Sequence, residues 1–340
     1  MLRDDITVKK AIMHILDPMM GEPVISGREM EPGAEVTDFF RLHIENITEN
    51  DDVKKCEFYE DSDLKDFLSD LSEENFAEKS MGIAGVIYDL MDENPDIPSG
   101  DLACIYFECK QQDYMALLKM DYRSSYTHYT DTSSGENINE MVKQRATWPV
   151  KGQKLSEACV ISLEDGSIRL IEKPYDVNGE KINYFSRLIL QCHTKLSEKT
   201  KLQIVEKAVA QVNREEMTGD EIEDAQTSLD AKARFYEALN EPGGAGVSRV
   251  SEKVFGGEPE KQEKFIKKVE EYAVEPDDVI APKKRTTVRK YERQTIKTDT
   301  GIVISIPMDK FRNSDIVEFE EQHDGSINII IKNISKLITK

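Results

Sequence analysis

The sequence predicts an α+β protein: a mixed N-terminal sheet with hairpins and flanking helices, an all-helical middle, and a small β-rich C-terminal part. Residues 102–107 form an unbroken apolar run of strand length. A second run at 114–120 follows after a short polar break, which predicts a hairpin inside a sheet. From about 195 to 274, strand signals give way to Glu, Lys and Ala, with apolar residues at helical spacing. Short branched runs return after Gly301. The expected parts are 1–194, 195–275 and 276–340.

The first part of the chain alternates strands and helices. Residues 6–16 and 54–59 have the composition of strands. A helix is expected at 34–46 and another at 75–91, where apolar residues recur at helical intervals. Ser62 stands where an N-cap would begin a further short helix.

The second half of this part predicts another hairpin and another helix. An Asp-Gly turn at 165–166 joins apolar runs at 155–163 and 167–172, which is a strong hairpin signal. Helical spacing of apolar residues predicts a helix that begins near Lys181. Residues 124–147 are polar, and we interpret them as a loop with one short strand at Ile138 as an option.

The middle of the chain predicts three or four amphipathic helices over 195–274, with breaks near Gly219 and at 242–244. Their apolar stripes are typical of core or dimer packing. Residues 276–282 are expected to be a linker. An Asp-Gly turn at 324–325 favours a final hairpin. Three strands are expected near the end, at 301–306, 316–319 and 327–331.

The 340-residue chain is acidic, with a formal net charge of -21. Hydrophobic residues make up 39% of it and charged residues 33%, which is the balance of a globular protein with ordinary cores. Such a molecule should as a whole repel nucleic acid and anionic membranes. Contact with DNA therefore has to come from a local basic patch or through another protein.

The five cysteines are scattered and form no CxxC pair, which favours reduced thiols in a cytosol and argues against a structural zinc site. No stretch approaches the roughly 18 apolar residues of a membrane span, and the N-terminus has no signal-peptide pattern. We therefore expect a cytoplasmic protein with no membrane contact, no bound metal and no cofactor.

One basic segment, residues 283–297, stands out from this acidic background, because its seven cations are opposed only by Glu292. If residues 287–297 are extended, Arg289, Tyr291 and Arg293 share one face, as phosphate contacts from a single strand require. The alternative is that the segment neutralises the protein's own acidic helices. The candidate DNA-binding residues are Lys283, Lys284, Arg285, Arg289, Lys290, Arg293 and Lys297.

A second constellation imitates a metal-dependent nuclease. Asp101, Glu108 and Lys110 follow the Asp…Glu-x-Lys arrangement, in which two carboxylates hold Mg²⁺ and the lysine assists the attacking water. On a strand, however, Asp101 points away from the other two, and such short patterns arise often by chance, so we favour a charged strand end, with Lys110 and Asp113 bordering a turn. The five histidines are dispersed, and no nucleophile–histidine pattern stands out. We predict no catalytic residue and expect a protein that is not an enzyme.

Several hydrophobic motifs occur in a fixed order along the chain. They lie at 10–16, 99–101, 116–119, 155–161, 183–192, 301–307 and 324–326. Their order and spacing resemble the bacterial 37-kDa nucleoid-associated protein family, of the NdpA or YejK type. The resemblance covers most of the chain. It implies an acidic, nucleoid-localised bacterial protein that binds double-stranded DNA and self-associates as a homodimer. It transfers no catalytic motif.

The leading hypothesis is therefore a non-enzymatic nucleoid-associated protein that binds double-stranded DNA through phosphate contacts, without a base-reading recognition helix. The second is an acidic interaction module, or DNA mimic, that binds nucleoid or DNA-processing proteins through the helical middle. The third, less favoured, is a Mg²⁺-dependent nuclease that uses Asp101, Glu108 and Lys110.

Overall fold

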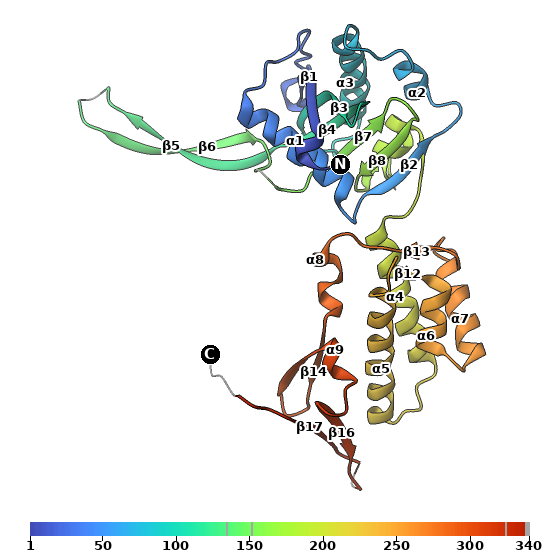
Figure 1. Ribbon diagram of the computed structural model, residues 1–340. Helices are drawn as coiled ribbons and strands as arrows, with labels where there is room; N and C mark the ends of the chain where they lie inside the picture. Colours follow the sequence, from blue (N-terminus) through green and yellow to red (C-terminus); the bar gives the residue numbers. More distant parts are fainter. Residues whose placement is uncertain (134, 151, 324, 337–340) are drawn as a thin grey trace. The chain divides into compact units, whose positions relative to one another are not determined.

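A computed structural model of the protein describes residues 1–133, 135–150, 152–323 and 325–336 (Figure 1). The chain divides into two compact units, Met1–Lys195 and Leu196–Lys340. Helix accounts for 36% of the structure and strand for 30%, which confirms the α+β class. Within the described residues, no helix is long and apolar enough to cross a membrane. A further boundary between 275 and 276 stays a prediction.

The first unit is built on a seven-stranded sheet in which every neighbouring pair of strands is antiparallel. The expected strands at 6–16, 54–59, 102–107 and 114–120 are all members of it. In spatial order the strands are β1 (Ile6–Leu16), β3 (Gly100–Cys109), β4 (Gln112–Asp121), β7 (Glu157–Ser162), β8 (Ser167–Ile171), β2 (Lys54–Phe58) and β11 (Cys192–Thr194).

Helices cover both faces of this sheet, which is why β3 reads as a continuous apolar run. Successive side chains of a strand point to opposite faces. Tyr106 packs in the core beneath α3 (Phe76–Glu93) and α2 (Asp63–Leu68), whereas Phe107 packs in the core beneath α1 (Ala34–Glu49). Each large apolar side chain buried this way contributes about 1.5–3 kcal/mol. The unit also contains the short helices η1 (Arg3–Asp5) and η2 (Pro18–Met20).

The central hairpin is shaped by its turn and by one glycine. Lys110 and Gln111 form a two-residue turn with φ of 54° and 65°, the left-handed geometry that matches strand twist. Gly100 lies opposite Asp121 at the other end of the hairpin. A Cβ at Gly100 would lie 2.6 Å from the carbonyl oxygen of Met120, so only glycine fits there.

The interpretation of 124–147 as a loop is wrong. β5 (Arg123–Asp131) and β6 (Ile138–Thr147) form a long two-stranded ribbon that extends away from the seven-stranded sheet (Figure 1). We call this ribbon the arm. Residues 123–130 and 138–146 are exposed, so neither face of the arm is covered. Because no face is buried, the residues show no apolar alternation from which the strands could be recognised.

The helix expected from near Lys181 is also largely wrong. The region begins with β9 (Tyr175–Val177) and β10 (Glu180–Ile182), which pair with each other. Only η3 (Phe185–Leu190), a single π-helical turn, follows. Gln191 then adopts a left-handed conformation, with φ of 48°, and the chain turns into the last strand of the sheet. The apolar residues of the predicted stripe do pack in the core, but they belong to three elements, β10, η3 and β11, and not to one helix.

The second unit begins with the expected helices: α4 (Glu198–Glu215), α5 (Glu221–Leu239), α6 (Val247–Phe255) and α7 (Pro259–Glu270). Their apolar stripes meet in one core, which includes Val205, Phe235 and Phe265. Ser197 caps α4 by accepting the amide of Thr200 at 3.2 Å. The packing interpretation of these stripes is thus confirmed for the core.

The expected linker at 276–282 is tied to this helical core. β13 (Val279–Ile280) pairs with β12 (Ala245–Gly246), and Ile280 is fully buried. The strands expected near the C-terminus are present, and a small core packs them against Ala233 of α5. Asp324 of the expected turn lies outside the described residues. The last elements are α8 (Arg285–Val288), η4 (Arg289–Tyr291), β14 (Arg293–Lys297), β15 (Val303–Pro307), α9 (Met308–Phe311), β16 (Val317–Glu321) and β17 (Ile327–Ile331).

Candidate nucleic-acid interface

The basic segment does not meet the condition under which Arg289, Tyr291 and Arg293 would share one face, because residues 287–297 are not extended throughout. It forms α8 and η4, and only β14, from Arg293 onward, is extended. Tyr291 is buried, with its ring 5.5 Å from that of Phe235 in an edge-on arrangement, and its hydroxyl donates to Glu206 at 2.7 Å. Burial, followed by this hydrogen bond, raises the pKa of the Tyr291 hydroxyl. Tyr291 therefore anchors the segment and does not share a surface with Arg289 and Arg293.

The cations around this anchor nevertheless lie on the surface. Six of the seven candidate residues are exposed, and Lys284 is half-buried. The segment thus presents a short row of positive charge on an otherwise acidic protein. The exposed residues are Lys283, Arg285, Arg289, Lys290, Arg293 and Lys297.

Several of these cations have partners within the protein. Arg285 binds Glu292 at 3.0 Å, and Lys290 binds Glu206 of α4 at 2.6 Å. The Arg285 hydrogen bond holds the pKa of Glu292 below its ordinary value. Arg293 donates to the hydroxyl and carbonyl oxygens of Ser305 at 2.8 Å each. The pair between Lys290 and Glu206 is the neutralising contact that the alternative interpretation expects.

The arm is a second candidate surface, and the sequence reasoning missed it. Its register places Tyr126 opposite Lys143 and His128 opposite Met141, so these four side chains share one face. Arg145, two residues beyond Lys143, continues that face next to a bulge. This face, which we call the basic face of the arm, carries no carboxylate.

The opposite face of the arm is different in character. Tyr129 pairs with Glu140, and Val142 and Ile138 lie on the same side. Tyr129, Ile138 and Val142 are 58%, 46% and 39% exposed. We call this side the apolar face of the arm. An isolated two-stranded ribbon is only marginally stable in water, so the contacts that hold the ends of the arm matter for its conformation.

A single carboxylate ties both ends of the arm to the sheet. Asp101 of β3 accepts hydrogen bonds from the Tyr122 hydroxyl at 2.5 Å and from the Trp148 indole nitrogen at 2.6 Å. Tyr122 directly precedes β5, and Trp148 directly follows β6. Trp148 also stacks on Phe39, with ring centroids 5.8 Å apart.

These contacts leave the nuclease hypothesis without a site. Asp101 and Glu108 lie seven residues apart on one strand, about 23 Å at the usual rise per residue, and on opposite faces. Glu108 pairs with Lys9 at 3.0 Å, and Lys110 sits in the hairpin turn. Among the residues that the structure describes, no cluster of three or more His, Cys, Asp or Glu side chains could hold a metal ion.

Comparison with known proteins decides the family. The profile of the nucleoid-associated protein YejK family matches residues 12–338, nearly the whole chain. The chain belongs to the YejK family. No curated protein matches it significantly.

Membership of the YejK family confirms the resemblance drawn from motif order and spacing. It associates the protein with the bacterial nucleoid, and the family is not a known enzyme family. Both candidate surfaces, the basic segment and the arm, lie within the matched residues.

Proposed function

We propose that this YejK-family protein binds double-stranded DNA, mainly through phosphate contacts, and does so without catalysis. The observation that carries the proposal is the exposure of six cations within residues 283–297, on a chain with a net charge of -21. A cluster of surface cations on a protein that is acidic overall usually indicates a binding site for an anionic ligand.

The internal partners of these cations do not oppose the proposal. Exposed ion pairs such as Arg285–Glu292 and Lys290–Glu206 contribute about 0–1 kcal/mol each, because water and salt screen them. A DNA phosphate can therefore replace a carboxylate at little cost, and release of counterions from DNA favours the exchange. With five to seven phosphate contacts, log K falls with log salt at a slope of about -4 to -6.

The basic face of the arm supplies a second contact in this proposal. The major groove of B-DNA is about 12 Å wide and admits a two-stranded ribbon. Lys143 and Arg145 would reach phosphates, while Tyr126 and Met141 would give the ribbon an adaptable contact surface along the groove wall. Loss of the two cations should reduce the salt slope by about 1–2.

Self-association is part of the proposed function. The apolar face of the arm, with Tyr129, Ile138 and Val142, supports a homodimer in which a second copy covers this side. Sedimentation velocity tests this point: Tyr129→Ser/Val142→Thr should shift a dimer toward monomer, and wild-type protein that sediments as a monomer at tens of micromolar would overturn it.

Fluorescence anisotropy of a labelled 30-base-pair duplex, titrated at several salt concentrations between about 50 and 200 mM, tests DNA binding. The expected result is binding that weakens steeply with salt. Arg289→Glu/Arg293→Glu/Lys297→Glu should flatten the slope. Its control, the exposed trio Lys65→Glu/Lys110→Glu/Lys181→Glu, changes net charge equally and should leave the slope unchanged. Equal slopes for both triple variants would remove the basic segment from the interface, and no binding of the wild type would overturn the proposal.

A further inference from the structure

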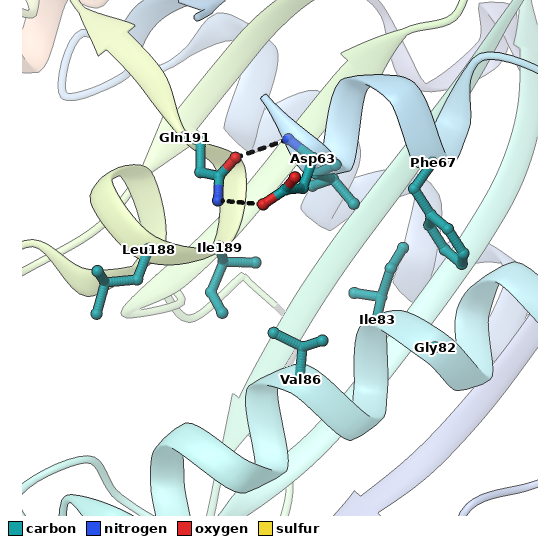
Figure 2. A pocket seen from close by; sticks show the side chains of 9 residues that line it. Asp63, Phe67, Gly82, Ile83, Val86, Leu188, Ile189 and Gln191 are labelled. Carbon is teal, nitrogen blue, oxygen red and sulfur yellow. Dashed lines mark hydrogen bonds between the residues drawn. The ribbon is translucent and has the colours of Figure 1, made fainter. Parts of the chain in front are cut away.

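The first unit has a groove that is apolar with an acidic rim, whereas the proposed DNA interface is basic. α2, α3 and η3 surround a cavity of about 370 Å³ (Figure 2). Apart from Asp63 and Gln191, the lining residues are apolar or glycine, and three of the large apolar side chains stay exposed: Phe67 and Leu188 at 38% each and Val86 at 57%. Large apolar side chains gathered around one cavity are a feature of interaction sites.

The walls of the groove are held by specific contacts. A Cβ at Gly82 would lie 2.8 Å from the Phe67 ring, so glycine is what lets this ring lie across α3. Lys79 holds the ring from another side: its Nζ lies 4.4 Å from the ring centroid and 2.7 Å from Asp70. Contacts within the protein thus fix the position of the Phe67 ring in the groove wall.

A polar clamp closes one end of the groove (Figure 2). The Asp63 amide donates to Gln191 Oε1 at 2.7 Å, and Gln191 Nε2 donates to Asp63 Oδ2 at 3.1 Å. Gln191 makes this reciprocal pair from a left-handed backbone conformation, with φ of 48°. The clamp joins the end of η3 to the start of α2 and so fixes the spacing of two walls.

The rim of the groove is acidic. On α3, Glu78 lies four residues before Gly82, Asp89 three after Val86 and Glu93 seven after Val86, so these exposed carboxylates follow that helix face. On α2, Asp63 lines the groove and Asp66 is exposed beside it.

The cations near the rim do not cancel this charge. Lys79 is paired with Asp70, and Arg187 is paired with Glu180 at 3.2 Å. Lys65 lies on the side of α2 that faces away from the lining residues, since it is two positions from both Asp63 and Phe67. The groove therefore combines an apolar floor with a negative edge, which DNA and anionic membranes would avoid.

We propose that this groove binds an amphipathic helix of a partner protein, whose apolar side chains enter the cavity and whose flanking Lys and Arg residues meet the rim carboxylates. Apolar anchors at i, i+3 or i+4, and i+7 are the usual way in which a helix occupies such a groove. Charge complementarity selects the partner, because the exposed carboxylates along the rim favour a basic helix over an acidic one. This surface differs from the helical middle of the chain and is independent of DNA binding.

The test uses two labelled helical peptides with the same leucine positions, one with lysines and one with glutamates on the polar face. Wild-type protein should bind the lysine peptide at least tenfold more tightly. Val86→Asp/Leu188→Asp removes two apolar contacts and adds two carboxylates. If the attraction were purely electrostatic, this variant would bind the lysine peptide more tightly than the wild type. The proposal instead expects binding at least tenfold weaker, because the apolar contacts are lost. The matched control Met217→Asp/Ile302→Asp changes two exposed apolar residues elsewhere and should bind like wild type.

Equal binding of both peptides, or tighter binding of the lysine peptide by the groove variant, would overturn the proposal. So would a groove variant that is monomeric where the wild-type protein is a dimer, because the groove would then be a contact between copies of this chain. Far-ultraviolet circular dichroism and thermal unfolding establish that the variants are folded. DNA anisotropy of the groove variant should match wild type, so that failure here is distinguishable from failure of the proposed function.

Discussion

Lys119 and Glu157 stand directly opposite each other on β4 and β7, and their side chains are fully buried with Nζ and Oε2 3.3 Å apart. Lys119 also binds Asp121 at 2.5 Å and the Pro98 carbonyl at 2.9 Å, and the Tyr175 hydroxyl donates to Glu157 at 2.6 Å. Burial raises the pKa of Glu157, while Lys119 acts in the opposite direction. The sheet interior thus contains a fully partnered ionic cluster.

Removal of one partner from this cluster should be costly. Lys119→Met leaves buried carboxylates without their cation, and the expected loss is about 3–5 kcal/mol in the free energy of unfolding of the first unit. Urea denaturation followed by tryptophan fluorescence reports this unit, because Trp148 is the single tryptophan. Lys110→Met, in the exposed hairpin turn, is the control and should change stability by less than about 0.5 kcal/mol. A small loss for Lys119→Met would mean that the cluster is hydrated.

Stability of the first unit should fall between pH 6.5 and 4. Burial lowers the pKa of His14 to about 4, and the ring accepts the Ser26 amide at 3.2 Å through Nδ1 while Nε2 faces Ser80. The unfolded chain takes up a proton near pH 6.5 but the folded protein only near pH 4, so stability is complete above 6.5 and is lost as the pH falls toward 4. His14 alone accounts for a loss on the order of 3 kcal/mol.

Urea midpoints at pH 7, 6 and 5 measure this dependence. In His14→Gln, the free energy of unfolding should depend less steeply on pH, by the slope that corresponds to uptake of about one proton on unfolding. In His193→Gln, at an exposed position, the pH dependence should have the same slope as in the wild type. His43 is buried too, and burial lowers its pKa to about 4, so part of the slope should persist in the His14 variant. Parallel profiles for wild type and His14→Gln would contradict the assignment.

Two glycine substitutions should have opposite effects. Gly100→Ala places a methyl group against the backbone of Met120 and Asp121 and should destabilise the first unit by at least about 1–3 kcal/mol. Gly85→Ala points into open space from the middle of α3 and should stabilise the protein by about 1 kcal/mol. Thermal unfolding of both variants checks the signs. Stabilisation by Gly100→Ala would show that the two strands can separate there.

The arm should be dispensable for folding. Replacement of residues 124–146 by a short Gly-Ser linker keeps Tyr122 and Trp148 and should leave the unfolding transition of the first unit within about 0.5 kcal/mol of wild type, since the deleted side chains are exposed. In the anisotropy assay the same deletion should weaken duplex binding. Unchanged DNA affinity together with an unchanged fold would remove the arm from the interface.

The elements that could be predicted from the sequence are those whose buried faces produce a regular pattern of apolar residues. The doubly covered strand β3 appears as an apolar run, and the four helices of the second unit appear as stripes at helical spacing. The arm could not be recognised, because strands exposed on both faces carry no alternation, even though Tyr126, Thr127 and Tyr129 favour strand structure. Its basic face emerges only from the register that pairs Tyr126 with Lys143.

The candidate sites were less predictable than the fold. The charge of the basic segment was evident from the sequence, but its conformation was not, because Tyr291 turns inward to reach Phe235 and Glu206. The groove had only a faint signal in Gly82, next to the apolar stripe of α3. Its other walls come from α2, which precedes α3, and from Leu188, Ile189 and Gln191, more than a hundred positions away, so no local pattern could assemble it.

The attachment of the arm has a mechanical consequence. Asp101, which holds both Tyr122 and Trp148, belongs to a strand that is hydrogen-bonded on both sides, between β1 and β4. A load applied at the tip of the arm is therefore carried into the interior of the sheet and not into a free edge that could peel.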